Sequence, residues 1–475
     1  MSSEPKPGAI ADAGVRGFPT SLVAAFLAAT FLSAALIFAI QPMFARFVLP
    51  RLGGSPGVWS VAMAFFQALL FCGYLYAHLL TRLPSWTARV ATHLTVSAVA
   101  LLWLPLGIAR GWGDPPASGE ALWLFGLFAA SIGAPYFALS ANGPLLQSWF
   151  ARGADRPGAD PYFLYAVSNA GSFLALLAYP LAIEPLLPLA GQSMLWSAGY
   201  VALVVLLAIC GALVLKRSGL QEHEAVARTE APPLRDLLRW CLLGAIPSGL
   251  LVAVTAQIST DIAAIPLVWV IPLALYLLTL VIVFRSWGEA THQRVVACVP
   301  WLLLAVAGVM VLAPESNLEG VRFIAELLLH LAVFVVVAFM CHGELARGRP
   351  HANHLTMFYL AMAFGGMVGG AFSSLAAPAL FSWIAEYPIL IVAAALCRPA
   401  SAQPEWSGDA RVLGAAAVAA VLVLGPGLLG RGAIYQVEYV TTAIGLMGLA
   451  AAALAWRSVP LFAAALAILL AIGRL

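Results

Sequence analysis

The chain alternates long apolar runs with short polar connections, and most runs reach the length of about 20 residues that an α-helix needs to cross a bilayer. The pattern predicts spans near 20–42, 58–80, 90–109, 121–148, 161–187, 192–215, 237–258, 263–285, 295–313, 322–343, 354–378, 383–397, 410–429, 437–456 and 458–473. The last three are short or interrupted by Gly and Pro, so the total is 14 or 15. The expected fold class is an all-α polytopic membrane protein.

The longest polar connection, KRSGLQEHEAVARTEAPPLRD, follows the sixth span and separates two groups of six. Two parallel six-helix repeats of the major-facilitator type, followed by extra C-terminal spans, are therefore expected. The predicted divisions are an N-terminal tail 1–19, a first repeat 20–215, a linker 216–236, a second repeat 237–400 and two or three extra spans in 401–475.

A weak internal similarity supports these repeats. The fourth span ends in NGPLLQSWFARG and the tenth in HGELARG, and both are followed by an aromatic-rich span. In those following spans Gly171 matches Gly366, and a later Pro180 matches Pro378. A chance match between membrane segments of low complexity is the alternative.

The composition fits a lipid environment. Hydrophobic residues make up 62% of the chain and charged residues 9%, whereas a soluble domain has about 25% charged residues. A net charge of +3 suggests no nucleic-acid partner. The six cysteines form no CxxC pair, so the sequence has no zinc-site or disulfide signature, and no cofactor is expected.

Lys and Arg residues indicate the orientation, because they gather in cytoplasmic connections. With the N-terminus in the cytoplasm, 18 of the 24 basic residues lie on the inner side of the predicted spans. The expected location is a bacterial inner membrane with a cytoplasmic N-terminus and a cytoplasmic linker 216–236.

The tenth span carries a stripe of polar residues. On a helix, Glu326, His330, Cys341 and Glu344 fall within roughly 60° of one another. Ionisable groups at membrane depth usually face a protein interior or a water-filled cavity, so we expect Glu326 and His330 to bind substrate or accept a proton. The alternative is a histidine hydrogen-bonded to another helix.

The inner end of this span combines Cys341, His342 and Glu344, which are the candidates for a catalytic or redox site. Together with His354, the residues His342 and Glu344 are weak candidates for a metal site. Neighbouring Cys341 and His342 point about 100° apart on one helix, which disfavours joint ligation. The alternative is a structural helix end in which Glu344 pairs with Arg347 or Arg349.

Two matching helices end in polar residues on the predicted outer side. Gln41 and Arg46 follow the first span, where Pro42 is expected to open the helix. Gln257 and Asp261 end the seventh span, which is the repeat partner of the first. We expect these residues to surround one cavity, with Asp261 pairing with Arg46 or binding a cation. In the alternative, Arg46 reaches lipid head groups and Asp261 caps the next helix.

Asn142 and Asn169, on the fourth and fifth spans, are further candidates for substrate binding. Asparagine in membrane helices also serves as a hydrogen-bonding link between helices, which is the alternative for both residues.

Four segments resemble one known family. They are AIQPMFARFVLPRLGGSPGVWSVAMAFFQALLFCGYLYAH (39–78), TDIAAIPLVWVIPLALYLLTLVIVF (260–284), MCHGELARGRP (340–350) and HLTMFYLAMAFGGMVGGAF (354–372). Together they are similar to the membrane region of bacterial fused major-facilitator/spermidine-synthase-like proteins. This resemblance covers roughly residues 20–400. It implies a transporter-like protein for a small polar, polyamine-related metabolite.

The sequence also departs from that family. Many members continue into a soluble aminopropyltransferase-like domain, whereas the last stretch of this chain is apolar up to Leu475. The glycine cluster GGMVGG (365–370) lies inside an apolar span, and its GxxxG pairs indicate close helix packing. The synthase chemistry is not expected in this chain. Two alternatives stay open, namely a membrane-embedded redox or metal-dependent enzyme and a scaffold for a separate soluble synthase-like partner.

Overall fold

A computed structural model describes residues 20–52, 56–113, 115–116, 119–152, 161–218, 231–261, 270–285, 287–312, 319–399, 448–450, 452–453, 456 and 458–472. All regular structure in these residues is helical. Nine of the described helical segments are long and apolar enough to cross a membrane, and three more are apolar but shorter. The predicted class of an all-α membrane protein is confirmed.

Six predicted spans make up the first half of the chain. Their elements are α2 (Thr20–Leu52), α3 (Pro56–Leu80), α4 (Trp86–Val99) with the 3-10 turn η1 (Ala100–Trp103), α5 (Glu120–Arg152), α6 (Phe163–Ala178) and α8 (Leu189–Ser218). Helix α6 continues through a π-helical segment η2 (Tyr179–Ile183) into α7 (Glu184–Leu186).

The second half repeats this order. Its elements are α9 (Leu234–Asp261), α10 (Val270–Arg285), α11 (Glu289–Leu312), α12 (Glu319–Arg347), the 3-10 turn η3 (Ala352–His354), α13 (Leu355–Ala371) and α15 (Glu386–Leu396). Helix α13 continues through a π-helical segment η4 (Phe372–Ala376) into α14 (Ala377–Leu380). The last described helix is α18 (Val459–Ile472), which packs against α11 and α15.

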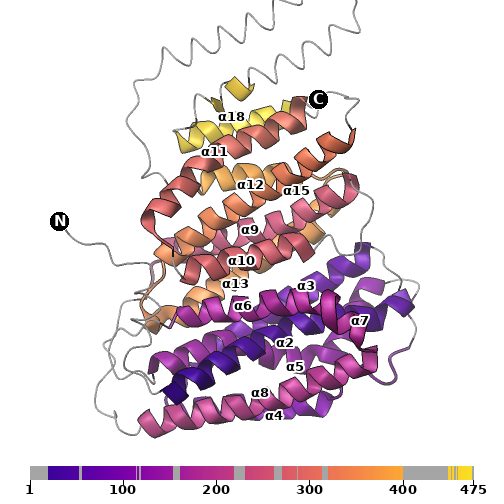
Figure 1. The fold of residues 1–475 in the computed structure, drawn as a ribbon, viewed down its shortest axis with the longest axis vertical. Helices are drawn as coiled ribbons and strands as arrows, with labels where there is room; N and C mark the ends of the chain where they lie inside the picture. The colour runs from indigo at the N-terminus through magenta and orange to yellow at the C-terminus, as the bar shows by residue number, and fades with distance from the viewer. Residues whose placement is uncertain are drawn as a thin grey trace, which may run out of the picture.

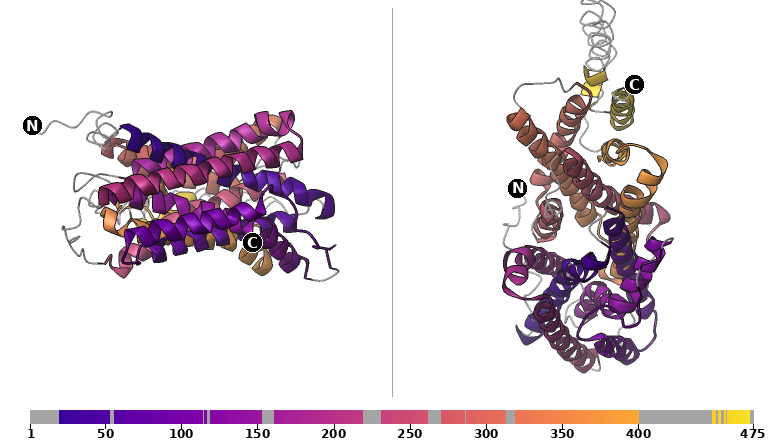
Figure 2. Two further views of the ribbon diagram at one scale, coloured as in Figure 1. Left: turned by 90° about the horizontal axis from the view of Figure 1, so that it is seen from below. Right: turned by 90° about the vertical axis from the view of Figure 1, so that its right-hand side faces the viewer.

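The same helix pairs contact each other in both halves. Helix α2 packs on α6 and α8, and α9 packs on α13 and α15 in the same way. The pair α3 and α5 corresponds to the pair α10 and α12. Figures 1 and 2 show the halves as adjacent blocks. They meet where α3 packs on α13 and α6 packs on α10. This arrangement is the parallel repeat of six and six that the sequence predicts.

A π-helical segment interrupts the same span of each half. In the fifth span it covers Tyr179–Ile183, and in the eleventh it covers Phe372–Ala376. Each segment is followed by a short α-helical piece that contains a proline, Pro185 or Pro378. A π-helical turn arises where the regular hydrogen-bond ladder is locally widened, and it bends a helix. The similarity of the two halves therefore extends to this local irregularity. Both interrupted spans lie where the halves meet.

Close glycine contacts fix the packing of α13 on α9. A Cβ atom built on Gly365 lies 2.0 Å from the Cys241 carbonyl oxygen, and one on Gly369 lies 2.0 Å from that of Ala245. The predicted role of this GxxxG pair in close helix packing is confirmed. In the first half, Gly171 approaches the Phe31 carbonyl of α2 in the same manner, at 2.5 Å. Gly366, its partner by sequence, makes no such close approach, because the nearest heavy atom to a Cβ there is Ser248 Oγ at 3.8 Å.

The expectation that Pro42 opens the first span is also wrong. Helix α2 runs without a break from Thr20 to Leu52 and contains both Pro42 and Pro50. Proline removes one hydrogen bond and crowds the preceding turn. The next turn is nevertheless held in place by burial, because Met43 and Phe44 are at most 2% exposed.

Some predictions concern residues that the structure does not describe. The predicted spans 410–429 and 437–456 lie wholly or mostly outside the described residues, as does much of the linker 216–236. The division boundaries, the total of 14 or 15 spans and the orientation of the N-terminus therefore stay predictions.

Candidate functional site

Three side-chain hydrogen bonds join the two halves at one end of the bundle. Tyr359 of α13 donates from its hydroxyl to Gln147 Oε1 of α5 at 2.7 Å. Tyr162, just before α6, donates to the carbonyl oxygen of Pro350 at 2.9 Å. These groups lie at the ends of α5 and α12 and at the starts of α6 and α13, so all of them belong to the same end of the bundle.

His78, near the end of α3, forms the third bond. The Arg82 guanidinium donates to His78 Nε2 at 3.3 Å, so the ring proton of a neutral imidazole resides on Nδ1. Nδ1 lies 3.0 Å from Thr356 Oγ1 of α13 and is the donor in this bond. These three bonds between the halves thus use hydroxyl, amide, imidazole and backbone carbonyl groups.

Aromatic rings fill the space beside these bonds. We call Tyr74, Tyr162, Tyr165 and Tyr359 the tyrosine seam, because they come from both halves and their rings meet. The ring centroids of Tyr165 and Tyr359 are 5.0 Å apart, and those of Tyr162 and Tyr359 are 6.1 Å apart. The Arg349 guanidinium carbon lies 5.1 Å from the centre of the Tyr162 ring, within the range of a cation–π interaction.

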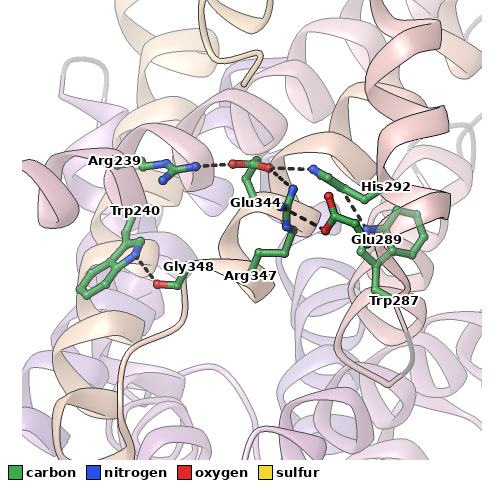
Figure 3. A network of polar contacts seen from close by, with 8 residues as sticks. All are labelled: Arg239, Trp240, Trp287, Glu289, His292, Glu344, Arg347 and Gly348. Atoms are coloured by element: carbon green, nitrogen blue, oxygen red, sulfur yellow. Dashed lines mark hydrogen bonds and ion pairs between the residues drawn. The ribbon is translucent and has the colours of Figure 1, made fainter. Parts of the chain in front are cut away.

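The polar network around Glu344 lies at the same end, within the second half (Figure 3). The Glu344 carboxylate receives hydrogen bonds from Arg239 of α9, from Arg347 at 3.2 Å and from His292 Nε2 of α11 at 2.7 Å. Arg347 also pairs with Glu289 at 3.1 Å. The carbonyl end of a helix disfavours a negative charge. These donors offset that effect at the end of α12, where Glu344 is 5% exposed.

Gly343 leaves room for the His292 and Trp287 rings of this network. A Cβ at this position lies 2.4 Å from His292 Nδ1 and 2.9 Å from Trp287 Nε1, so any larger residue displaces both rings. The indole N–H of Trp287 donates to His292 Nδ1 at 3.1 Å. The proton of a neutral His292 therefore resides on Nε2, where it faces Glu344. The alternative in which Glu344 pairs with Arg347 is confirmed and extends to Arg239 and His292.

The outer residues predicted on the first span find partners within their own half. Gln41 Nε2 lies 3.5 Å from the hydroxyl of Tyr136, and Arg46 Nη1 lies 3.0 Å from Glu184 Oε1 of α7. Arg46 thus has an acidic partner within its own half, on α7, and its expected pairing with Asp261 stays a prediction. The side chain of Asp261 lies outside the described residues, and Gln257 is half-buried on α9. The shared outer cavity stays a prediction.

The two asparagines differ in what they bind. Asn142 accepts from His93 Nε2 of α4 at 2.7 Å and donates to Ser33 of α2 at 2.9 Å, so it links three helices as its alternative proposed. Asn169 donates to the Tyr165 carbonyl of its own helix at 2.8 Å.

The polar stripe of α12 spreads over several neighbours. His330 Nδ1 lies 2.7 Å from the Tyr387 hydroxyl of α15, and His342 Nδ1 lies 2.8 Å from Thr279 Oγ1 of α10. Cys341 is fully buried, while Glu326 is half-buried. His330 thus forms a hydrogen bond to another helix, as the alternative interpretation of this residue predicted.

The metal candidates do not converge on one point. His342 bonds to α10, Glu344 bonds to α9 and α11, and His354 lies at the start of α13. Within the described part of the chain, no three His, Cys, Asp or Glu side chains come together in a group suited to a metal ion.

The sequence did not single out several partners in these networks. His292 and Arg239 precede or begin apolar runs, so they read as connecting residues rather than parts of a buried site. Tyr359 and Gln147 look like ordinary members of apolar spans. His93 was the exception, because a lone ionisable residue inside a predicted span indicates a polar partner or cavity.

Comparisons with known proteins were made against families, curated sequences and solved structures. No family model and no curated protein matches the chain. The chain aligns with the POT family transporter PepTSo at a TM-score of 0.49 and 14% identity, covering 80% of this chain and 97% of that one. It aligns with the human organic anion transporter MFSD10 at 0.45 and 14%, covering 79% and 100%.

A third solved structure is that of the nucleoside transporter NupG, with a TM-score of 0.45, 14% identity and coverage of 79% and 98%. Alignments at this level assign neither a substrate nor a mechanism to this chain. The link to the fused spermidine-synthase-like proteins stays a prediction.

Proposed function

We propose that the protein is a membrane transporter that moves a small organic cation between its two six-helix halves. The tyrosine seam is the observation that carries this proposal. It lies where the halves meet, its rings come from both halves, and the Gln147 amide bonds to one of them, Tyr359. A path between two similar halves that rock against each other is the general design of transporters with internal repeats.

The chemistry of the seam favours a cation. The face of a tyrosine ring carries partial negative charge and attracts ammonium and guanidinium groups within about 6 Å of its centre. Arg349 already occupies such a place above Tyr162, at 5.1 Å. Polyamines belong to this substrate class, and the sequence resemblance points to the same class. Hydroxyl and amide groups of Tyr359 and Gln147 supply hydrogen-bond acceptors for an amine.

The enzyme alternative receives less support. A reactive cysteine needs access and a nearby base or positive charge, whereas the Cys341 side chain is fully buried. Its neighbour His342 is bonded to Thr279, away from Glu344. A scaffold for a separate soluble partner does not by itself require polar groups between the halves, so the seam favours transport.

Uptake into proteoliposomes tests the proposal. Purified protein is reconstituted, and entry of radiolabelled spermidine, putrescine and choline is measured, with mannitol as an uncharged probe. We expect at least one cation, and not mannitol, to enter faster than into protein-free liposomes. The absence of uptake of all three cations, or equal uptake of mannitol, contradicts the proposal.

A matched pair of variants at Tyr165 tests the role of the rings. Tyr165→Phe keeps the aromatic face and should keep most of the uptake. Tyr165→Leu removes the face and should lower the apparent affinity about 2- to 30-fold, the range that corresponds to a cation–π energy of roughly 0.5–2 kcal/mol. Equal effects of the two substitutions would show that ring packing, and not cation binding, matters at this position.

A further inference from the structure

Each half carries one buried histidine in its third span, and Nε2 of that ring meets the following span. In the first half, His93 Nε2 of α4 lies 2.7 Å from Asn142 Oδ1 of α5. In the second half, His292 Nε2 of α11 lies 2.7 Å from Glu344 Oε1 of α12. Both histidines are at most 1% exposed. Both rings thus lie on the third span of their half and bond to the fourth, although Asn142 lies deeper in α5 than Glu344 does in α12.

A chain of hydrogen bonds fixes the protonation of His93. The Ser33 hydroxyl donates to the Leu139 carbonyl at 3.5 Å, so Ser33 Oγ accepts the bond from Asn142 Nδ2 at 2.9 Å. Asn142 Oδ1 therefore faces His93 and accepts a proton from Nε2. Nδ1 of the neutral ring carries a lone pair and needs a donor.

The two halves differ at this second nitrogen. In the second half, the indole of Trp287 donates to His292 Nδ1 at 3.1 Å. In the first half, His93 Nδ1 is buried and has no hydrogen-bond partner among the described protein atoms. Trp86, at the start of α4, lies under the Arg89 guanidinium, at 4.5 Å.

Two residues beside His93 carry hydroxyl groups that resemble His93 Nδ1 in their surroundings. The Tyr76 hydroxyl and Ser97 Oγ are buried and likewise lack a partner within the described structure. The rings of Tyr76 and His93 have centroids 6.0 Å apart, and Ser97 follows His93 by one helical turn. A buried polar atom without a hydrogen-bond partner destabilises the folded protein. The ring contact and the helical spacing place Tyr76 and Ser97 beside His93, so the three atoms point to a shared ligand.

We propose that an ordered water molecule binds beside His93 in the core of the first half. The water donates one hydrogen to His93 Nδ1 and accepts hydrogen bonds from the hydroxyls of Tyr76 and Ser97. Buried waters typically make about three hydrogen bonds to groups that are otherwise unsatisfied, which is the set found here. The water takes the part that the Trp287 indole plays in the second half.

Water-edited solid-state NMR of the full-length protein in lipid bilayers tests this site. The histidines carry ¹⁵N, and the His93 ring is identified by its through-space correlation with the Asn142 side-chain carbonyl carbon. We expect a ring protonated on Nε2 whose Nδ1 gains signal from water early. His342, whose Nδ1 is bonded to Thr279 at 2.8 Å, serves as the internal reference and should gain it late.

Two results overturn the proposal. One is a His93 ring protonated on Nδ1, and the other is an Nδ1 signal that builds up as slowly as that of His342. A double variant with Tyr76→Phe and Ser97→Ala should lose the early signal. The wild-type spectrum decides the matter by itself if this variant does not fold, because the assignment and the reference both come from the unaltered protein.

Discussion

The Tyr359 hydroxyl and Gln147 Oε1 lie 2.7 Å apart and join α13 of the second half to α5 of the first. This bond is buried at the end of the bundle where the tyrosine seam lies. A hydrogen bond of this kind contributes about 0.5–1.5 kcal/mol. The bond therefore stabilises the contact between the halves at this end, but by an amount small enough for the contact to open.

Removing this bond should make the seam easier to open. The reporter is Ala166→Cys, at a buried position of α6 one helical turn after Tyr162. We expect Gln147→Leu to speed its labelling by N-ethylmaleimide about 2- to 10-fold, in line with the loss of about 0.5–1.5 kcal/mol. The background has its six native cysteines replaced. Gln41→Leu is the matched control, because Gln41 bonds to Tyr136 within one half. An unchanged rate, or an equal rise with the control, would count against a closing role for Gln147.

The Glu344 carboxylate should matter more for stability than the nearby Glu289. Glu344→Leu leaves the buried His292 N–H without its acceptor and removes one acceptor each from Arg239 and Arg347, so we expect a loss of about 1–3 kcal/mol. Glu289 pairs with Arg347 at the surface, where exposed pairs contribute about 0–1 kcal/mol. Thermal unfolding in detergent at one pH compares Glu344→Leu with Glu289→Gln. Equal losses would show that the network around Glu344 is not a structural centre.

Gly365 and Gly369 of α13 allow its close contact with α9, whereas Gly366 is not needed for this contact. Gly369→Ala places a methyl group 2.0 Å from the Ala245 carbonyl and should destabilise the protein by about 1–3 kcal/mol. At Gly366 the nearest heavy atom is Ser248 Oγ at 3.8 Å, so Gly366→Ala should change the unfolding temperature little. If both variants unfold at the wild-type temperature, the close approach of these helices does not exist in the membrane.

The sequence predicts the helical class and the repeat well because both depend on local and periodic signals. Apolar runs mark spans whatever their partners, and matching polar ends recur between the fourth and tenth spans. Helix ends were predicted less well. Helix α2 continues through Pro42, because burial of Met43 and Phe44 outweighs the local preference of proline, and burial is a tertiary effect.

The partners in the candidate site could not be predicted from one span at a time. One interpretation paired Glu344 with Arg347 or Arg349, nearby in the sequence, and Glu344 does bind Arg347. Its bonds to Arg239 and His292 join helices that are more than 50 residues away in sequence. The pairing of Arg46 with Glu184 was missed for the same reason, because the π-helical segment before Glu184 has no clear signal in the sequence.

The orientation in the membrane follows from the basic residues and has a direct test. We expect the linker 216–236 to be cytoplasmic. A single cysteine introduced by Ala225→Cys in the cysteine-free background should resist a membrane-impermeant maleimide in intact cells and react after permeabilisation. Reaction in intact cells would reverse the assignment, and the tyrosine seam would then lie at the outer end.

The central claim is that the two halves separate at the tyrosine seam, and a distance measurement tests it most directly. Spin labels are attached at Thr87 of α4 and Leu238 of α9, two exposed positions near helix starts in opposite halves, and distances are measured by pulsed electron paramagnetic resonance in lipid. A transporter should show two distance populations, and Gln147→Leu should increase the longer one. A single distance distribution that Gln147→Leu leaves unchanged would contradict transport between the halves.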